Sequence, residues 1–217
     1  MVMGLIKIGQ AEYQKRLYER GEIFMQTLEY FRKLEDGNVR KDVYEGAEKI
    51  LQVNWIKIAD GNRDIEFSIK DGSMSRANYY STPQTYCNAY CMIGITEDDK
   101  GKDGIIDSEN MKFGEFMILI YNVKEFIKRV RLKLAALGIH NSWGPIKYYE
   151  EYDFQGNLSP FFKRKQFSAE KEVRIIAIPD YNRPIKLEIG SIQDIAIPMP
   201  ISKLSKIRLL EDNRFEF

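Results

Sequence analysis

The 217-residue chain contains 44% hydrophobic and 30% charged residues, a composition that is typical of a folded domain and excludes intrinsic disorder. Lys and Arg number 33 against 32 Asp and Glu, which argues against the strongly basic surface that non-specific duplex binding needs. One histidine and two cysteines are too few for the usual Cys/His zinc site, and they disfavour catalysis that depends on imidazole. No structural zinc site is therefore expected, and the leading interpretation assigns no residue as a metal ligand.

The sequence also lacks an apolar run of the about 20 residues that a membrane-spanning helix needs, and its first residues do not resemble a signal peptide. We therefore expect a cytoplasmic protein with no membrane partner. In a reducing compartment, Cys87 and Cys91 are expected to be half-buried thiols near the start of a strand rather than a disulfide.

The first part of the chain is predicted to form a strand, a helix and a strand, over residues 5–8, 11–20 and 22–27. Gly21 is a natural stop for the helix. We expect residues 28–32 to continue the second strand into a polar loop over residues 33–48, where apolar periodicity is weak.

Two strands joined by a hairpin are expected in the middle of the chain. Residues 65–69 alternate strictly between apolar and polar side chains, and residues 50–58 are rich in Ile. Asp60, Gly61 and Asn62 mark the turn between them. Residues 74–86 have no clear period, and buried strands are expected at residues 89–96 and 115–121, on either side of an acidic loop at residues 97–110.

The clearest helix begins after Asn122, which with Glu125 resembles a capping box. Apolar residues then recur with a period of about 3.6 residues up to Gly138. The outer face of this helix carries five cations: Lys124, Lys128, Arg129, Arg131 and Lys133. This face is interpreted as a solvated surface or, alternatively, as a patch that faces phosphate groups.

Short strands separated by Pro and Gly dominate the rest of the chain, at residues 146–149, 173–178, 185–189, 192–197 and 206–209. His140 is expected in the loop after the long helix, where a lone His is more often structural than catalytic. The sequence thus predicts an α+β fold in a single domain over residues 1–217, with a twisted, mainly antiparallel sheet or sheets and a few helices.

A row of charged residues leads into the strand at residues 173–178. Glu170, Glu172 and Arg174 fall at i, i+2 and i+4, so on a strand they would share one face. The guanidinium would keep one carboxylate ionised while the other holds a proton, which suits stabilising a cationic, sugar-like transition state or activating a nucleophile. The alternative is a row of solvent-exposed charges on an edge strand.

A second polar cluster follows the strand at residues 22–27. It comprises Gln26, Thr27 and Arg32, followed in the loop by Arg40, Asp42 and Glu45. Because loops at strand ends often carry binding groups, this cluster is expected to clamp a ribose or a phosphate. The alternative is a charged surface loop with local ion pairs.

Other motifs restrict the classes of ligand. The aromatic and hydroxyl-rich segment at residues 79–86 is expected either to stack a base or nicotinamide ring or to pack in the core. The sequence has no glycine motif of a P-loop or a dinucleotide fold, which excludes kinase and Rossmann-type sites. Residues 97–107 do not match a calcium loop, because Lys100 and Lys102 interrupt the carboxylates.

Four segments occur in an order that a known family shares. They are a helix leading through Gly21 into residues 22–32, a strand at residues 91–96, a strand and helix from residue 113, and a final set comprising Phe162, Lys163, Phe167, Glu170, Glu172 and Arg174. Over most of its length the chain resembles a widespread bacterial and phage family of domains of unknown function. Some members of that family are linked to abortive infection.

The segment Glu170, Lys171 and Glu172 is also similar to the E-x-E motif of ADP-ribosyltransferases. This resemblance implies NAD as a substrate and Glu172 as the catalytic residue, which orients the nicotinamide ribose and stabilises an oxocarbenium-like transition state. It implies that Glu170 activates the acceptor nucleophile. The opening strand, helix and strand are likewise similar to the start of that fold.

The same resemblance implies a set of NAD-binding residues. Lys7 stands on the first strand, where the family has Arg or His, and Arg32 or Arg40 would supply the missing guanidinium. Thr96, or Ser81 with Thr82, would stand for the hydroxyl motif of the middle strand. The set is completed by Gln26, Thr27 and Arg174.

Three functions follow from these patterns. The leading hypothesis is an NAD-consuming, ADP-ribosyltransferase-like toxin or phage-defence effector that modifies nucleic acid or protein. The second is a non-catalytic antitoxin or phage-defence regulator that binds a protein or RNA partner through the helix face at residues 124–133 and the aromatic segment. The third is a nuclease that would hold Mg²⁺ with Asp42, Glu45 and Glu172.

Overall fold

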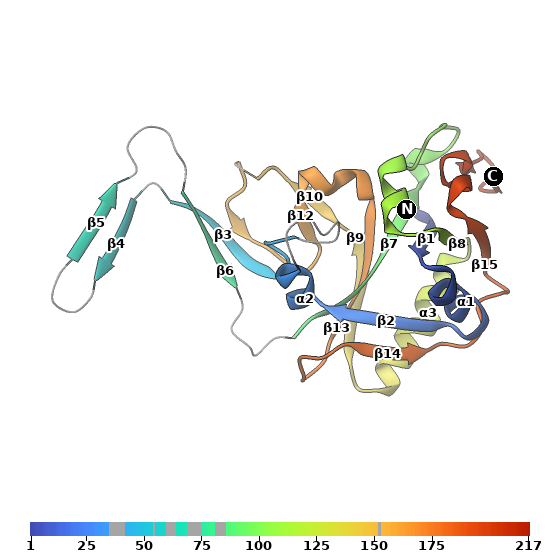
Figure 1. The fold of residues 1–217 in the computed structure, drawn as a ribbon, viewed down its shortest axis with the longest axis horizontal. Helices are drawn as coiled ribbons and strands as arrows, with labels where there is room; N and C mark the ends of the chain where they lie inside the picture. Colours follow the sequence, from blue (N-terminus) through green and yellow to red (C-terminus); the bar gives the residue numbers. More distant parts are fainter. Residues whose placement is uncertain (35–41, 54, 60–63, 69–74, 81–85, 152) are drawn as a thin grey trace.

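The computed structural model describes residues 1–34, 42–53, 55–59, 64–68, 75–80, 86–151 and 153–217 (Figure 1). Between residues 53 and 85 only the backbone of these ranges is described, and in the other ranges the side chains are described as well. The chain folds as α+β with mainly antiparallel sheets and few helices, which confirms the predicted class at this level.

The centre of the molecule is an eight-stranded antiparallel sheet, in which six strands follow the order β14-β2-β7-β1-β8-β15 and β13 joins β7 to β9. Its strands are β1 (Val2–Gly9), β2 (Glu22–Thr27), β7 (Asn88–Thr96), β8 (Phe116–Ile120), β9 (His140–Pro145), β13 (Glu172–Ile178), β14 (Ile185–Glu188) and β15 (Ala196–Pro200). Three of them pair with β7: β2 and β1 share one of its edges, and β13 lies along the other.

Three α-helices are described, α1 (Ala11–Arg20), α2 (Leu28–Lys33) and α3 (Val123–Ala136). The predicted end of α1 is confirmed, because Gly21 has a φ of 65°, in the left-handed region that glycine adopts at low cost. The predicted start of α3 is confirmed as well, because the Asn122 side chain accepts a hydrogen bond from the Glu125 N–H.

The expectation that residues 28–32 continue the second strand was wrong. Thr27 Oγ1 accepts a hydrogen bond from the Tyr30 N–H at 3.1 Å, so Thr27 ends β2 and caps α2. The expected strand at residues 50–58 is divided between β3 and β4, which pair in different sheets. The hairpin pairing is confirmed by β4 and β5, and its turn lies outside the described residues.

Four small sheets accompany the main one, and Figure 1 shows the hairpin of β4 and β5 at a distance from it. They are built from β3 (Ala47–Val53), β6 (Ser75–Tyr80) and β11 (Gly156–Asn157); β4 (Trp55–Ala59) and β5 (Asp64–Ser68); β10 (Lys147–Tyr149) and β12 (Phe162–Arg164); and β16 (Arg208–Leu209) and β17 (Phe215–Glu216). Short 3₁₀ helices are η1 (Glu97–Asp99), η2 (Ser108–Phe113), η3 (Lys165–Glu170) and η4 (Ile201–Lys206).

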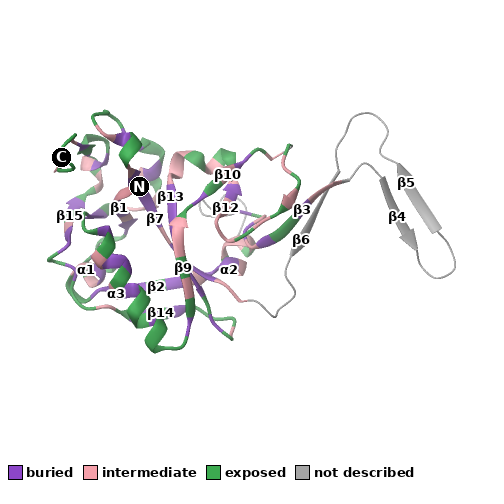
Figure 2. Ribbon diagram, turned by 180° about the vertical axis from the view of Figure 1, so that it is seen from behind, coloured by how far each residue is buried: buried purple, intermediate pink, exposed green. Residues whose placement is uncertain are grey.

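The main sheet carries an apolar core on both faces. Along β8, Ile118 and Ile120 belong to the cluster under α1 and α3, whereas Met117 and Leu119 belong to the cluster that includes residues of η2 and η4. Figure 2 shows the buried strands between the partly exposed helices. A sheet with apolar side chains on both faces is rigid, so it holds the side chains at its ends in fixed positions.

Several local predictions are settled by this fold. Cys87 and Cys91 are free, half-buried thiols, as expected. His140 lies in β9 rather than in a loop, and the strand expected at residues 192–197 is instead β15 at Ala196–Pro200. Among the described residues, no helix is both long enough and apolar enough to span a bilayer. The cytoplasmic location stays a prediction.

Candidate functional site

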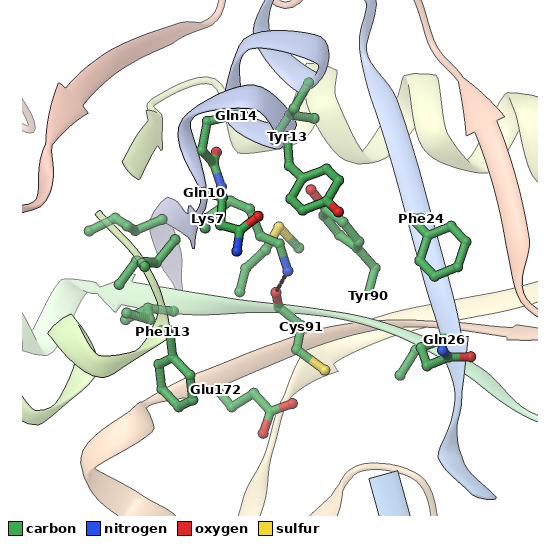
Figure 3. A pocket seen from close by; sticks show the side chains of 18 of the residues that line it. Lys7, Gln10, Tyr13, Gln14, Phe24, Gln26, Tyr90, Cys91, Phe113 and Glu172 are labelled. Carbon is green, nitrogen blue, oxygen red and sulfur yellow. Dashed lines mark hydrogen bonds between the residues drawn. The ribbon is translucent and has the colours of Figure 1, made fainter. Parts of the chain in front are cut away.

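A cavity of about 1150 Å³ lies where β7 changes partners along one edge (Figure 3). β2 pairs with β7 only at Asn88 and Ala89, and β1 pairs with it only from Ile93 onward. The edge of β7 around Cys91 is therefore open between the two strands. Lys7 Nζ donates a hydrogen bond to the Cys91 carbonyl oxygen at 2.7 Å across this gap. The cavity thus forms at a break in the pairing along this edge of β7.

One side of the cavity is formed by a buried ion cluster centred on Arg174. Its guanidinium donates two hydrogen bonds to Glu45, at 2.7 and 2.8 Å, and its Nε donates to Glu172 Oε1 at 2.6 Å. Arg174 also donates to the Pro160 carbonyl at 2.7 Å and is 1% exposed. A guanidinium that is fully paired in this way holds both carboxylates in fixed positions.

Lys163 completes the cluster from β12. Its Nζ donates to Glu170 Oε2 at 2.6 Å and to Glu172 Oε2 at 3.0 Å. Both Glu170 and Glu172 line the cavity, as does Lys163 itself. The cluster therefore contains three carboxylates and two cations, so its formal charge is −1 when every group is ionised.

Glu170 and Glu172 meet at Lys163 because of the backbone between them. Lys171 has a φ of 44°, in the left-handed region that a residue with a side chain rarely adopts. This residue turns the chain from η3 into β13, and its Nζ pairs with Asp99 at 2.5 Å and with the Ile105 carbonyl at 3.0 Å. Strained backbone of this kind is concentrated at functional sites.

The expectation that Glu170, Glu172 and Arg174 line one strand face was wrong for Glu170, which ends η3 before the strand begins. The alternative of exposed charges on an edge strand was also wrong. β13 lies between β7 and β9, and Glu172 and Arg174 are 5% and 1% exposed. The structure does bring all three residues into one cluster.

The three carboxyl groups differ in their affinity for a proton. Burial disfavours ionisation of Glu172, but the positive charges of Arg174 and Lys163 outweigh it and hold the pKa of Glu172 well below its usual range. Burial raises the pKa of Glu170 and that of Glu45, although a cation opposes the shift at each. One cluster therefore presents a fixed anion beside a carboxyl group that holds a proton more readily.

The remaining predicted NAD-binding residues are dispersed. Gln26 lines the cavity, and its Oε1 accepts a hydrogen bond from the Thr27 N–H at 3.0 Å. Thr27 and Arg32 line a smaller cavity of about 450 Å³ instead. Thr96 caps η1 by pairing with Asp99 and does not line the larger cavity. Arg40, Ser81 and Thr82 lie outside the described residues.

The proposed Mg²⁺ set is not brought together. Asp42 pairs with Arg164 at 3.1 Å, whereas Glu45 and Glu172 pair with Arg174. Within the part of the chain that the structure describes, no group of three His, Cys, Asp or Glu side chains is placed to hold a metal ion. Each of these carboxylates is thus paired with an arginine of the protein, and Arg174 lies between Glu45 and Glu172.

Sequence reasoning missed several residues of the site. Lys163 enters the prediction only through the resemblance to a known family. No sequence pattern points to Tyr148, whose hydroxyl accepts a hydrogen bond from the Glu172 N–H at 2.8 Å. Tyr13 and Phe24 are more than half exposed and line the cavity. No spacing in the sequence links these positions, because each comes from a different element.

No family model matches the chain, no curated protein is similar to it, and no solved structure matches its fold. The resemblances to the phage-associated family and to ADP-ribosyltransferases therefore stay predictions that rest on the residues quoted for them.

Proposed function

We propose that this protein is an ADP-ribosyltransferase-like enzyme that cleaves the bond between nicotinamide and ribose in NAD and transfers ADP-ribose to a nucleic-acid or protein acceptor. The observation that carries the proposal is the buried Glu172, which Arg174 and Lys163 hold in place at the wall of a large cavity. The effector role, as a toxin or a phage-defence protein with a partner antitoxin, is part of the same proposal and rests on the resemblance alone.

The proposed reaction requires a fixed negative charge near the ribose. When the bond between nicotinamide and ribose breaks, the nitrogen takes the electron pair and positive charge develops on the ribose. A carboxylate that is already held in place stabilises that charge without reorganisation. Arg174 and Lys163 keep Glu172 in its ionised form and fix its position, which supports this role.

Glu170 suits the second half of the reaction. A general base works best when its pKa lies closer to the operating pH, and burial raises the pKa of Glu170. Glu170 would take the proton from an acceptor hydroxyl or amine while that group forms a bond to the ribose. Glu170 lines the same cavity as Glu172, so a ligand bound there would lie near both residues.

The cavity is adequate for a dinucleotide. Ligand pockets commonly have volumes of about 300–1000 Å³, and this cavity is of about 1150 Å³. Tyr13, Phe24 and Phe113 give its wall aromatic surface, on which a planar ring can stack (Figure 3).

NAD labelled in the adenine ring, incubated with the protein and with RNA, DNA or host lysate, tests the proposal. We expect release of free nicotinamide and transfer of label to one acceptor class. Absence of both, with the protein folded and all three acceptors supplied, contradicts the proposal.

The same assay separates the alternative of a non-catalytic binding protein, which predicts capture of a protein or RNA partner with no loss of NAD. Two observations concern the surface through which such a binding protein would contact its partner, namely the helix face at residues 124–133 and the aromatic segment. Arg129 on α3 is held by Glu125 and Asp194, at 3.0 and 2.5 Å, and so is not presented to a partner. The side chains of residues 79–85 lie outside the described part of the chain.

A further inference from the structure

Two strands at the cavity have an edge that no other described strand covers. Residues 90–92 of β7 pair with β13 alone, because β1 and β2 leave this part of the opposite edge open. Residues 22–25 of β2 pair with β14 alone. Both segments contribute residues to the cavity wall. The cavity therefore lies between two open strand edges.

The backbone groups of Cys91 point into the cavity. In an antiparallel strand the N–H and C=O of one residue face the same edge, and those of the next residue face the opposite edge. The Gly94 N–H donates to the Lys171 carbonyl oxygen at 2.8 Å, on the β13 side of β7. Cys91 lies three residues earlier, so its N–H and C=O face the open edge. Lys7 Nζ donates to the Cys91 carbonyl there, in place of a strand (Figure 3).

The backbone groups of Phe24 point toward the open edge of β2 by the same alternation. The Leu28 N–H donates to the Cys87 carbonyl oxygen at 2.9 Å, on the β7 side of the chain. Phe24 lies four residues earlier, so its N–H and C=O face this side as well. Within the described part of the chain, no strand or side chain pairs with these two groups. An unpaired strand edge is a template for another strand.

The side chains around these edges fit a polypeptide better than a nucleic acid. Six lysine or arginine residues and six glutamates line the cavity, so their charges balance and leave no positive excess for a row of phosphates. Tyr13, Phe24 and Tyr30 also line it and are 57%, 54% and 46% exposed. Exposed aromatic side chains of this kind are enriched where proteins bind one another.

We propose that an extended segment of a polypeptide binds in the cavity and adds as a strand to the open edge of β2. Main-chain hydrogen bonds to Phe24 hold the segment, and the exposed aromatic rings contact its side chains. The inference deepens the proposed function, on which it rests in taking this segment as the acceptor of ADP-ribose. Glu170 and Glu172 line the same cavity, so the acceptor class that the site favours is protein.

A library of random 12-residue peptides, displayed on phage and selected on the full chain, supplies the probe. The selected peptide is then synthesised with one backbone amide methylated at a time, and its Kd is measured by calorimetry. Every second N–H of a strand faces its neighbour, so we expect methylation at alternate positions to weaken binding at least about tenfold and methylation between them to have less effect. Absence of a binding peptide, or effects without alternation, overturns the proposal.

Two substitutions at one position locate the site. Phe24→Pro removes the N–H that faces the open edge, whereas Phe24→Ala keeps it, and both remove the ring. Proline is tolerated in a strand where its missing N–H faces away from the paired strand, so pairing with β14 is kept. We expect Phe24→Ala to bind the peptide about tenfold more weakly than the wild type, and Phe24→Pro at least about tenfold more weakly again.

Phe116→Ala is the matched control, because Phe116 is 40% exposed and does not line the cavity. Circular dichroism checks that each variant is folded. If Phe24→Pro does not fold, Phe24→Ala and the methylation scan decide the matter. Wild-type affinity in folded Phe24→Ala, or equal affinities of the two folded Phe24 variants, overturns the proposal.

Failure of this inference differs from failure of the proposed function. If the peptide binds with the expected alternation while NAD is never consumed, the strand site stands and the transferase does not. If nicotinamide is released and the label passes to RNA or DNA while no peptide binds, the transferase stands and the strand site does not.

Discussion

Two arginines of this protein have nearly the same set of partners in different surroundings. Arg174 binds Glu172, Glu45 and the carbonyl of Pro160, and Arg129 binds Glu125, Asp194 and the carbonyl of Ser191. The side chain of Arg174 is 2% exposed and that of Arg129 is 23% exposed. Burial is the main difference between the two clusters.

This difference changes what the carboxylates do. At Arg129 the pKa values of both carboxyl groups, Glu125 and Asp194, are lowered, mainly by hydrogen bonds from the guanidinium. In the buried cluster the pKa of Glu172 is lowered, whereas those of Glu45 and Glu170 are raised by burial. Of the two clusters, only the buried one shifts the pKa values of like groups in opposite directions, and enzymes use such opposite shifts to divide acid and base roles.

The largest expected effect comes from removing the central cation of the buried cluster. Arg174→Met leaves Glu45 and Glu172 buried without their shared partner, and we expect it to lower the free energy of unfolding by about 3–5 kcal/mol. Urea denaturation measures this loss. The matched variant Arg129→Met is expected to lose far less, and equal losses would show that burial does not distinguish the two clusters.

The second effect is on the pH dependence of stability. The folded-state pKa of Glu172 is depressed, so its contribution is present above the unfolded value of 4.5 and is lost as the pH falls below it. The pKa of Glu170 is raised, so its ionisation costs stability as the pH rises above 4.5. In denaturation series, Glu172→Gln is expected to flatten the stability profile below pH 4.5, and Glu170→Gln is expected to flatten it above pH 4.5. Identical pH profiles of the two variants would contradict the opposite pKa shifts of Glu172 and Glu170.

A third and smaller effect tests the backbone that separates the two carboxyl groups. Lys171 has a positive φ, which costs an ordinary residue about 1–2 kcal/mol and costs glycine little. Both Lys171→Ala and Lys171→Gly lose the pair with Asp99. We expect the glycine variant to be more stable than the alanine variant by about 1 kcal/mol in thermal unfolding. A more stable alanine variant would contradict the left-handed conformation.

The smallest effect is the response of the exposed cluster to salt. At about 1 M salt the Debye length is about 3 Å, so exposed charges are screened and buried ones much less. The small stability difference between the wild type and Arg129→Met is expected to vanish at this salt concentration, while the loss in Arg174→Met persists. Melting temperatures at low and high salt measure both. A salt-dependent loss in Arg174→Met would place that cluster in contact with solvent.

Much of the fold could be predicted because its signals are local. Gly21 ends α1 and Asn122 begins α3, both as predicted, whereas β2 ends at Thr27, earlier than expected. The strand was expected to continue beyond Thr27 because residues 28–32 include apolar side chains, whereas the cap formed by the Thr27 hydroxyl is a single hydrogen bond. This hydrogen bond forms with the backbone of the folded helix, so the pattern of residues alone does not reveal it.

The candidate site could be predicted only in part. Glu172 and Arg174 are neighbours on one face of a strand, so their pairing follows from the two-residue period. Glu45 is 129 positions from Arg174 in the chain, and no periodicity connects them. The left-handed Lys171, which brings Glu170 to Lys163, has no signal either, because lysine rarely adopts that conformation.

The catalytic role that we propose for Glu172 at the cavity wall is tested most directly by the rate at which two Glu→Gln variants release nicotinamide from NAD. Glu172→Gln removes the fixed charge in the buried cluster, and Glu125→Gln removes the corresponding charge in the exposed one. We expect Glu172→Gln to slow nicotinamide release by about 10²–10³-fold and Glu125→Gln to leave it unchanged. Equal rates in a folded Glu172→Gln variant and the wild type would contradict the proposed role of Glu172.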